Sequence, residues 1–236
     1  MTTYQTRRRT RLTPLGRLVF GVLAVAALIG LVAGAKAVAA GLGVGEPKSE
    51  AARAGESGES DLPGAEVGEH PDASVVVTYD VASRGSIEVP LTDFAREAQD
   101  ILDDPAGWRS ARVGFDRVEG GGDFTLWLAT ADQLTGFAED CAPEYSCRVG
   151  RDVVINQDRW LHGALPGALD GIPMGEYRTM AVNHEVGHWL GLDHTACPGG
   201  GLLAPLMMQQ SKGLDGCLAN QYPLPEERRA PALGLG

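Results

Sequence analysis

Residues 183–194 read NHEVGHWLGLDH, and this stretch holds three of the five histidines in the 236-residue chain. His184 and His188 are four residues apart, so on a helix they lie one turn apart on the same face. Two imidazoles at this spacing can bind one metal ion together, while Glu185 stands beside the pair and can take a proton from water. The H-E-x-x-H spacing therefore predicts a zinc site with Glu185 as general base.

A third ligand requires the chain to leave the helix and turn back. Gly191 can adopt the left-handed conformation that ends a helix, and His194 is then the expected third ligand. Three histidine ligands leave one position of a tetrahedral zinc ion open for water. Two interpretations remain for Gly187, inside the helix: a tolerated cost in helix stability, or close packing beneath the metal.

The elements that must position these residues can be outlined from hydrophobic periodicity. A helix is predicted from Tyr177 over YRTMAVNHEVGHWLG, which lacks proline and places both motif histidines on one face. A second helix is predicted for LTDFAREAQDILDD, ended by Pro105. Strands are predicted at SVVVTYDV, ARVGFDRV, DFTLWLAT and around residues 153–155, with an EGGG turn at 119–122 and a loop at 161–176. This order lacks repeated βα alternation and indicates an α+β fold.

The N-terminal region has the pattern of a membrane anchor. Five arginines precede an uncharged run of 18 residues, Leu18–Ala35, and a weaker apolar run continues to Val44. Such a run is just long enough to cross a bilayer. We predict a cytoplasmic basic segment at 1–17, one transmembrane or signal-anchor segment at 18–44, and an extracellular domain beyond it. The alternative is a signal peptide cleaved after small residues near 35–39, which would give a secreted protein.

The rest of the chain is acidic and changes in composition twice. Residues 45–73 are rich in Gly, Ala, Ser, Glu and Pro and predict a disordered acidic linker, 74–225 the folded domain, and 226–236 a disordered tail. The chain has a net charge of −11, but the residues after 44 carry 14 basic and 31 acidic side chains, a net charge of −17. Nucleic acid is therefore not an expected partner, because its phosphates would be repelled.

All four cysteines follow the apolar segment: Cys141, Cys147, Cys197 and Cys217. An exported domain with an even number of cysteines predicts two disulfides, although three pairings are possible. We favour Cys141 with Cys147 and Cys197 with Cys217, which close short loops on either side of the histidine cluster. A cysteine-rich zinc site is the rival interpretation, and no C-x-x-C spacing supports it; free thiols are the remaining alternative.

The extended motif H-E-x-x-H-x-x-G-x-x-H resembles that of the metzincin branch of zinc metalloproteases, in which a turn with a methionine lies beneath the metal. The segment 204–208, APLMM, resembles that turn, with Met207 the better match. With the phrases INQDRW, NHEVGHWLG and APLMMQQ, residues 74–225 are similar to an uncharacterised actinobacterial family, domain of unknown function 3152. The resemblance implies a zincin-like domain with a mixed twisted sheet, an active-site helix and one Zn²⁺.

These observations predict an exported, membrane-tethered zinc endopeptidase whose partners are the membrane and a peptide or protein substrate. In this mechanism Glu185 accepts a proton from water activated by zinc and returns it to the leaving amine. One alternative is a non-catalytic, zinc-stabilised binding or adhesion module, although metal binding alone does not require Glu185. Another is a zinc hydrolase that acts on cell-wall peptides.

Overall fold

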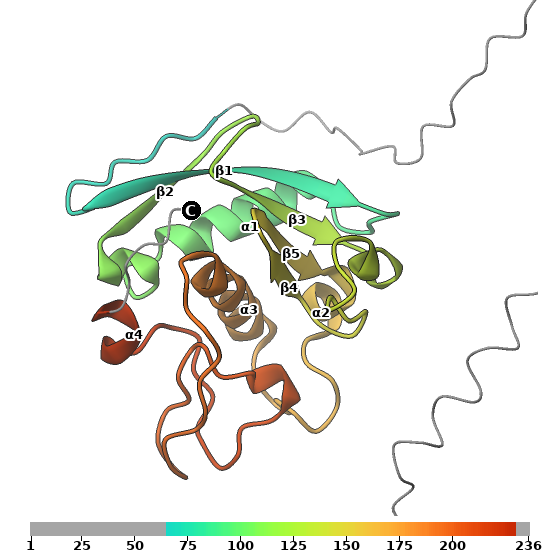
Figure 1. Ribbon diagram of the computed structural model, residues 1–236, viewed down its shortest axis with the longest axis vertical. Coiled ribbons are helices and arrows are strands. Elements are labelled where there is room, and N and C mark those ends of the chain that lie inside the picture. The colour runs from blue at the N-terminus through green and yellow to red at the C-terminus, as the bar shows by residue number, and fades with distance from the viewer. Residues whose placement is uncertain (1–64, 230–236) are drawn as a thin grey trace, which may run out of the picture. The chain divides into compact units, whose positions relative to one another are not determined.

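A computed structural model describes residues 65–229, which form a mixed five-stranded sheet with helices packed against it (Figure 1). The sheet order is β2-β1-β3-β5-β4. The strands are β1 (Val75–Arg84), β2 (Val113–Arg117), β3 (Phe124–Ala129), β4 (Cys147–Val149) and β5 (Asp152–Asn156). Neighbouring strands are parallel except β4, which pairs antiparallel with β5 at the edge. The prediction of an α+β fold with a mixed sheet is confirmed.

The long strand β1 organises the sheet because its two halves pair with different partners. Residues 75–79 pair with β2, and residues 79–84 pair with β3. The segment between β2 and β3 must therefore cross the middle of β1, and Val118 N donates to Tyr79 O at 2.8 Å on the way. At Gly122 a Cβ atom would lie 2.5 Å from the Tyr79 Cα. The EGGG turn is thus a crossing between two parallel strands, and its last glycine permits the close approach of two backbones.

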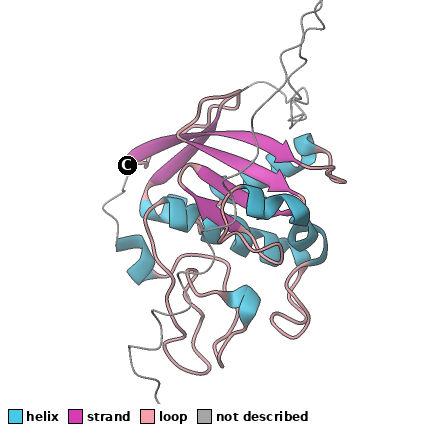
Figure 2. Cartoon of the chain, turned by 45° about the vertical axis from the view of Figure 1, so that its right-hand side comes forward, coloured by secondary structure: helices cyan, strands magenta, loops and turns pink. Residues whose placement is uncertain are grey.

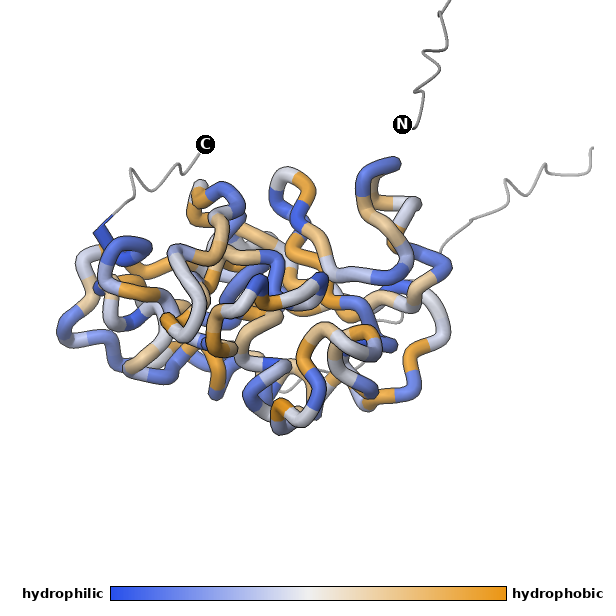
Figure 3. The backbone as a smooth tube through the Cα atoms, turned by 90° about the horizontal axis from the view of Figure 1, so that it is seen from below, coloured by the Kyte–Doolittle hydropathy of each residue, from blue (hydrophilic) through white to orange (hydrophobic). Residues whose placement is uncertain are grey.

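Two helices cover the same face of the sheet (Figures 1 and 2). They are α1 (Leu91–Asp103) and α3 (Met174–Trp189), which includes the predicted motif helix and begins three residues before Tyr177. On β1 the alternate residues Val77, Tyr79 and Val81 are buried, as expected for a strand with one face in the core. Figure 3 shows hydrophobic and hydrophilic residues interspersed along the folded chain.

The remaining elements are short. They are the 3₁₀ turns η2 (Trp108–Ala111), η3 (Ala131–Gly136) and η4 (Gln210–Lys212), and the helices α2 (Gln157–His162) and α4 (Pro225–Arg229). Both predicted disulfides, Cys141–Cys147 and Cys197–Cys217, are confirmed. The first ends at Cys147, where β4 begins. Two disulfides fit an extracellular location.

The ordered structure extends beyond both predicted ends of the domain. On the N-terminal side, Glu66 in the predicted linker forms a bridge with Arg117 of β2, and Gly68 N donates to an Asp116 oxygen at 2.9 Å. On the C-terminal side, α4 includes residues 226–229, which we predicted as tail. Both additions are held by polar contacts, so hydrophobic periodicity gave no sign of them.

The predicted transmembrane segment, 18–44, lies outside the described residues. Within residues 65–229 no helix is long and apolar enough to cross a membrane.

The crossing over β1 predicts a difference between two glycines of one turn. Gly122→Ala should destabilise the domain by about 1–3 kcal/mol, because the new methyl group meets backbone atoms that cannot move freely. Gly120→Ala is the matched control, since no atom lies within 4 Å of the position that its new methyl group would take. Thermal unfolding followed by circular dichroism measures the difference, at about 2–4 °C per kcal/mol for a protein of this size. Equal melting temperatures for the two variants would contradict the crossing.

Candidate metal centre

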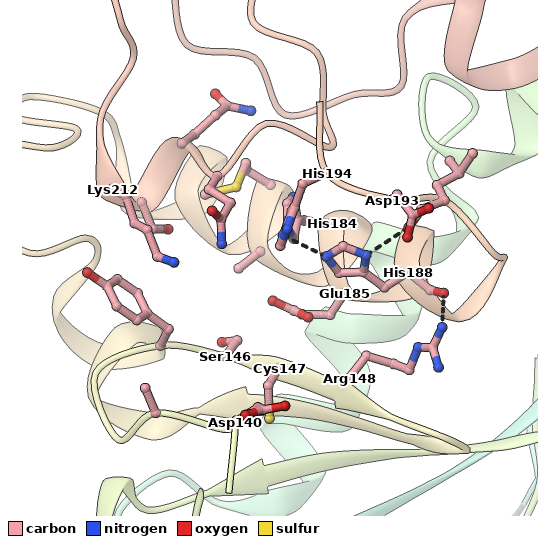
Figure 4. A pocket seen from close by; sticks show the side chains of 18 of the residues that line it. Asp140, Ser146, Cys147, Arg148, His184, Glu185, His188, Asp193, His194 and Lys212 are labelled. Atoms are coloured by element: carbon pink, nitrogen blue, oxygen red, sulfur yellow. Dashed lines mark hydrogen bonds between the residues drawn. The ribbon is translucent and has the colours of Figure 1, made fainter. Parts of the chain in front are cut away.

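The three predicted histidines come together at the C-terminal end of α3. One ligand nitrogen from each of His184, His188 and His194 lies within 4.8 Å of the others. His184 and His188 occupy successive turns of α3, with ring centroids 4.7 Å apart, and the Nε2 atoms of His188 and His194 are 3.0 Å apart. Figure 4 shows the three rings facing one another. The predicted geometry of three converging imidazoles is present in the structure.

The chain reversal that brings in His194 occurs at Gly191. This residue has φ +94°, and Leu192 N donates to Gly187 O at 3.0 Å while Gly191 N donates to His188 O at 3.1 Å. This pair of hydrogen bonds is the Schellman motif, in which a left-handed residue ends the helix. The left-handed conformation predicted for Gly191 is confirmed.

Main-chain carbonyl groups fix the orientation of two of the rings. His184 Nδ1 lies 2.8 Å from Leu206 O, and His188 Nδ1 lies 2.8 Å from Leu192 O. A carbonyl oxygen can only accept, so in both rings Nδ1 carries the proton and Nε2 of the neutral ring keeps its lone pair. Both Nε2 atoms are thus free to act as metal ligands. Backbone carbonyls here perform the orienting role that carboxylates perform at many other metal sites.

Burial keeps the cluster uncharged. It lowers the pKa of His184 to about 3, and it also lowers the pKa values of His188 and His194. His194 is the most exposed of the three histidines. Neutral imidazole is the form that binds metal. Three neutral ring nitrogens that lie within 4.8 Å of one another form a donor set that fits Zn²⁺, which favours imidazole ligands at tetrahedral sites.

Glu185 is buried beside the histidine cluster, and it lines one cavity together with the three histidines. Burial raises the pKa of its carboxyl group to about 8, and the guanidinium group of Arg148 acts in the opposite direction. Arg148 lies on the edge strand β4, and its Nη2 donates to His188 O at 2.6 Å (Figure 4). This contact joins the edge strand to the C-terminal end of α3, where a cation also interacts favourably with the helix dipole.

The predicted methionine turn packs against the motif helix. Met207 is fully buried, and a Cβ atom on Gly187 would lie 2.4 Å from its sulfur and 2.8 Å from the Trp108 Cζ2 atom. Trp108 also donates from Nε1 to Asn183 O at 3.0 Å. Of the two interpretations of Gly187, close packing is the one that the structure supports.

A cavity of about 450 Å³ opens beside the cluster. It is bounded by β4 and the preceding loop on one side and by the segment after Met208 on the other. Tyr145, Tyr177 and Lys212 are among the residues that line it. The Lys212 Nζ atom lies 5.0 Å from the Tyr145 ring centroid. Volumes of this size are typical of sites that bind small molecules.

Several contributors to the site had no signal in the sequence pattern. Arg148, Trp108 and Tyr145 are far from the motif in sequence and reach it only through the folded sheet and loops. Tyr222, which follows the methionine turn, does not line the cavity; its hydroxyl donates to Asp104 at 2.7 Å.

The contact between Gly187 and Met207 predicts a specific effect on metal binding. Gly187→Ala should lower both the melting temperature and the zinc affinity of the full-length chain, because the added methyl group displaces Met207 and disturbs the helix turn between His184 and His188. Gly175→Ala, on the exposed first turn of the same helix, meets no neighbour within 4 Å and should leave both unchanged or raise stability slightly. Competition titration with a chromogenic chelator measures the affinity. Unchanged zinc affinity in Gly187→Ala would refute the role of this packing.

Comparison with known proteins assigns the chain to a family but does not indicate an activity. The family model described as "Protein of unknown function (DUF3152)" matches residues 54–228, which is more than half of the chain and includes every site residue named above. No curated protein matches the chain significantly. The chain belongs to the DUF3152 family of proteins of unknown function.

Proposed function

We propose that this protein is an exported zinc-dependent endopeptidase of metzincin type, tethered to the membrane by residues 18–44. One observation carries the proposal: three neutral imidazoles converge at a cavity that also holds a buried glutamate. A structural metal site would fill its coordination positions with protein ligands, whereas three ligands beside an open cavity are typical of a catalytic site. The buried methionine packed against Gly187 of the motif helix supports the metzincin assignment, as does the mixed sheet with its motif helix.

Glu185 is the residue that moves the proton in this mechanism. His184, His188 and His194 would hold the zinc ion, which when bound would supply Lewis acidity toward a peptide carbonyl group and toward water near neutral pH. Glu185 Oε accepts a proton from the attacking water and donates it to the leaving amine nitrogen. Burial places its pKa at about 8, within the range useful for both steps, and positive charge nearby favours its ionised form.

The edge strand β4 gives a means of holding the substrate. It is the last strand in the sheet order, and Cys147 and Arg148 line the cavity. An extended peptide can add to such an edge through main-chain hydrogen bonds, which are independent of side-chain sequence. The disulfide at Cys147 and the bond from Arg148 to His188 O fix the strand relative to the ligands. A peptide held there would border the cavity that Glu185 also lines.

The two alternatives share the ligands and differ in what the cavity does. A non-catalytic binding module gains nothing from a buried carboxyl group at the ligands, since burying an ionisable group costs free energy. A hydrolase for cell-wall peptides would use the same groups on a different substrate. The open cavity favours an enzyme over a binding module, and product analysis distinguishes the two enzymes.

The general-base role predicts a separation of metal binding from catalysis. Glu185→Gln should keep stoichiometric zinc and lose peptide hydrolysis by several orders of magnitude, because the amide cannot accept the proton. Glu176→Gln, an exposed glutamate on the first turn of the same helix, should keep both. Zinc content by mass spectrometry and cleavage of a fluorogenic peptide library are the two measurements. If Glu185→Gln cleaves as fast as the wild type, Glu185 is not the base.

The metal requirement gives a second test. Treatment of the full-length protein with 1,10-phenanthroline should abolish cleavage, and added Zn²⁺ should restore it, while His194→Ala should not be restored. Parallel incubation with protein substrates and with cell-wall muropeptides, followed by mass spectrometry of the products, identifies the substrate class. Cleavage of muropeptides alone would favour the cell-wall hydrolase.

A further inference from the structure

Glu227 is a buried carboxylate outside the motif and close to the end of the described chain. It lies on α4, with only 8% of its surface exposed. Its Oε2 atom accepts from Leu224 N at 2.7 Å, three residues earlier, while Pro225 occupies the first helical position. A glutamate at the third position that bonds back to the residue before the helix, with proline first, stabilises a helix start. This local arrangement explains how a short helix forms in a segment that lacks hydrophobic periodicity.

The same carboxylate also binds the methionine turn. Oε2 accepts from Leu206 N at 3.0 Å, and Oε1 accepts from Met207 N at 2.8 Å. Three main-chain N–H groups therefore point at one buried carboxylate, two of them from a segment 20 residues away. Helix capping requires only the bond from Leu224, so capping leaves the other two unexplained.

The turn that Glu227 holds is connected to two of the three ligands. Met207 N and Leu206 O belong to one peptide group, and that oxygen accepts the Nδ1–H of His184 at 2.8 Å. The oxygen of the next peptide group, Met207 O, accepts from Thr195 N at 3.1 Å, directly after His194. Glu227 and His184 thus bind opposite ends of a single peptide unit.

We infer that Glu227 is a positioning residue of the metal centre and acts on His184 through the Leu206–Met207 peptide group. A carboxylate on the N–H side of a peptide increases the negative charge on its carbonyl oxygen, because hydrogen bonds in a chain polarise one another. The stronger acceptor holds His184 Nδ1–H and makes Nε2 a better donor to a metal. Carboxylates commonly act on metal-bound histidines by direct contact, and here a peptide group stands between the two.

This inference rests on the zinc site of the proposed function but does not require peptidase activity. Glu227, 43 positions after His184, thus tunes metal binding without touching any of the three histidines. A merely structural role for Glu227 would change the stability of the domain and leave the affinity of the folded protein for metal unaltered. Metal affinity and ligand spectroscopy therefore separate the two roles.

The test compares Glu227→Gln with Glu226→Gln in the full-length chain. Glutamine has one acceptor oxygen, so its NH₂ group faces at least one of the three main-chain donors. The carboxylate then no longer polarises the Leu206–Met207 peptide group. Glu226 is exposed on the same helix, and its substitution makes the same change in charge. Zinc affinity, measured by chelator competition well below both melting temperatures, should fall about 10- to 100-fold in Glu227→Gln and stay unchanged in Glu226→Gln. The visible absorption bands of bound Co²⁺ should shift only in Glu227→Gln.

The outcomes distinguish this inference from the proposed function. Equal zinc affinity and an identical Co²⁺ spectrum in folded Glu227→Gln overturn the inference, even where the wild type cleaves peptides. A fall in affinity supports it, even where the wild type cleaves nothing and the peptidase proposal fails. A wild-type chain that binds neither Zn²⁺ nor Co²⁺ overturns both.

A second measurement covers the case in which Glu227→Gln does not fold. In the ¹⁵N-labelled wild type, zinc should move the amide proton resonance of Met207 downfield more than that of Leu224. Both amides donate to the same carboxylate, but only Met207 N–H shares a peptide group with the acceptor of His184. Equal displacement of the two resonances would overturn the action of Glu227 on His184 through the Leu206–Met207 peptide group, without any substitution.

Discussion

The arrangement of the three-histidine cluster depends on hydrogen bonds from Nδ1 atoms to main-chain carbonyl groups. An imidazole contributes to a metal site only when its unprotonated nitrogen faces the other ligands. The hydrogen bond that fixes the proton on one ring nitrogen determines which nitrogen keeps the lone pair. Leu206 O and Leu192 O make this choice for His184 and His188. Both carbonyls belong to segments that follow α3 in sequence, so His184 and His188 are oriented by the chain after it leaves the helix.

The local parts of this arrangement could be predicted from the sequence. The spacing of His184 and His188 follows from 3.6 residues per turn, and Gly191 is needed for a left-handed residue at the helix end. The cysteine pairs close loops of 6 and 20 residues, short enough to be chosen from loop length. In each case the interacting residues are near one another in sequence, so residue type and spacing carry the information.

The contributors that could not be predicted are tertiary. Strand β4 has three residues, too few for an alternating pattern, and its position at the sheet edge depends on pairing with β5. The parallel order of β2, β1 and β3 depends on the chain crossing β1, whereas the EGGG sequence would serve equally well in a hairpin. The Pro225 and Glu227 positions do form a helix-start pattern, but the second task of Glu227, at the methionine turn, has no local signature.

The two sides of the cavity are stabilised by different kinds of interaction, and this explains where polar residues are buried. The side formed by the sheet and α3 rests on a hydrophobic core that includes Phe124 and Val186. The opposite side, residues 195–222, has little regular structure, so its backbone groups need other partners. Asn220 Nδ2 donates to Ala204 O at 2.9 Å, and Gln210 Nε2 donates to Asn220 O at 2.7 Å. Together with the Cys197–Cys217 disulfide and the carboxylate of Glu227, these amide groups take the place of strand pairing. The loop that they hold carries the Leu206 carbonyl group that orients His184.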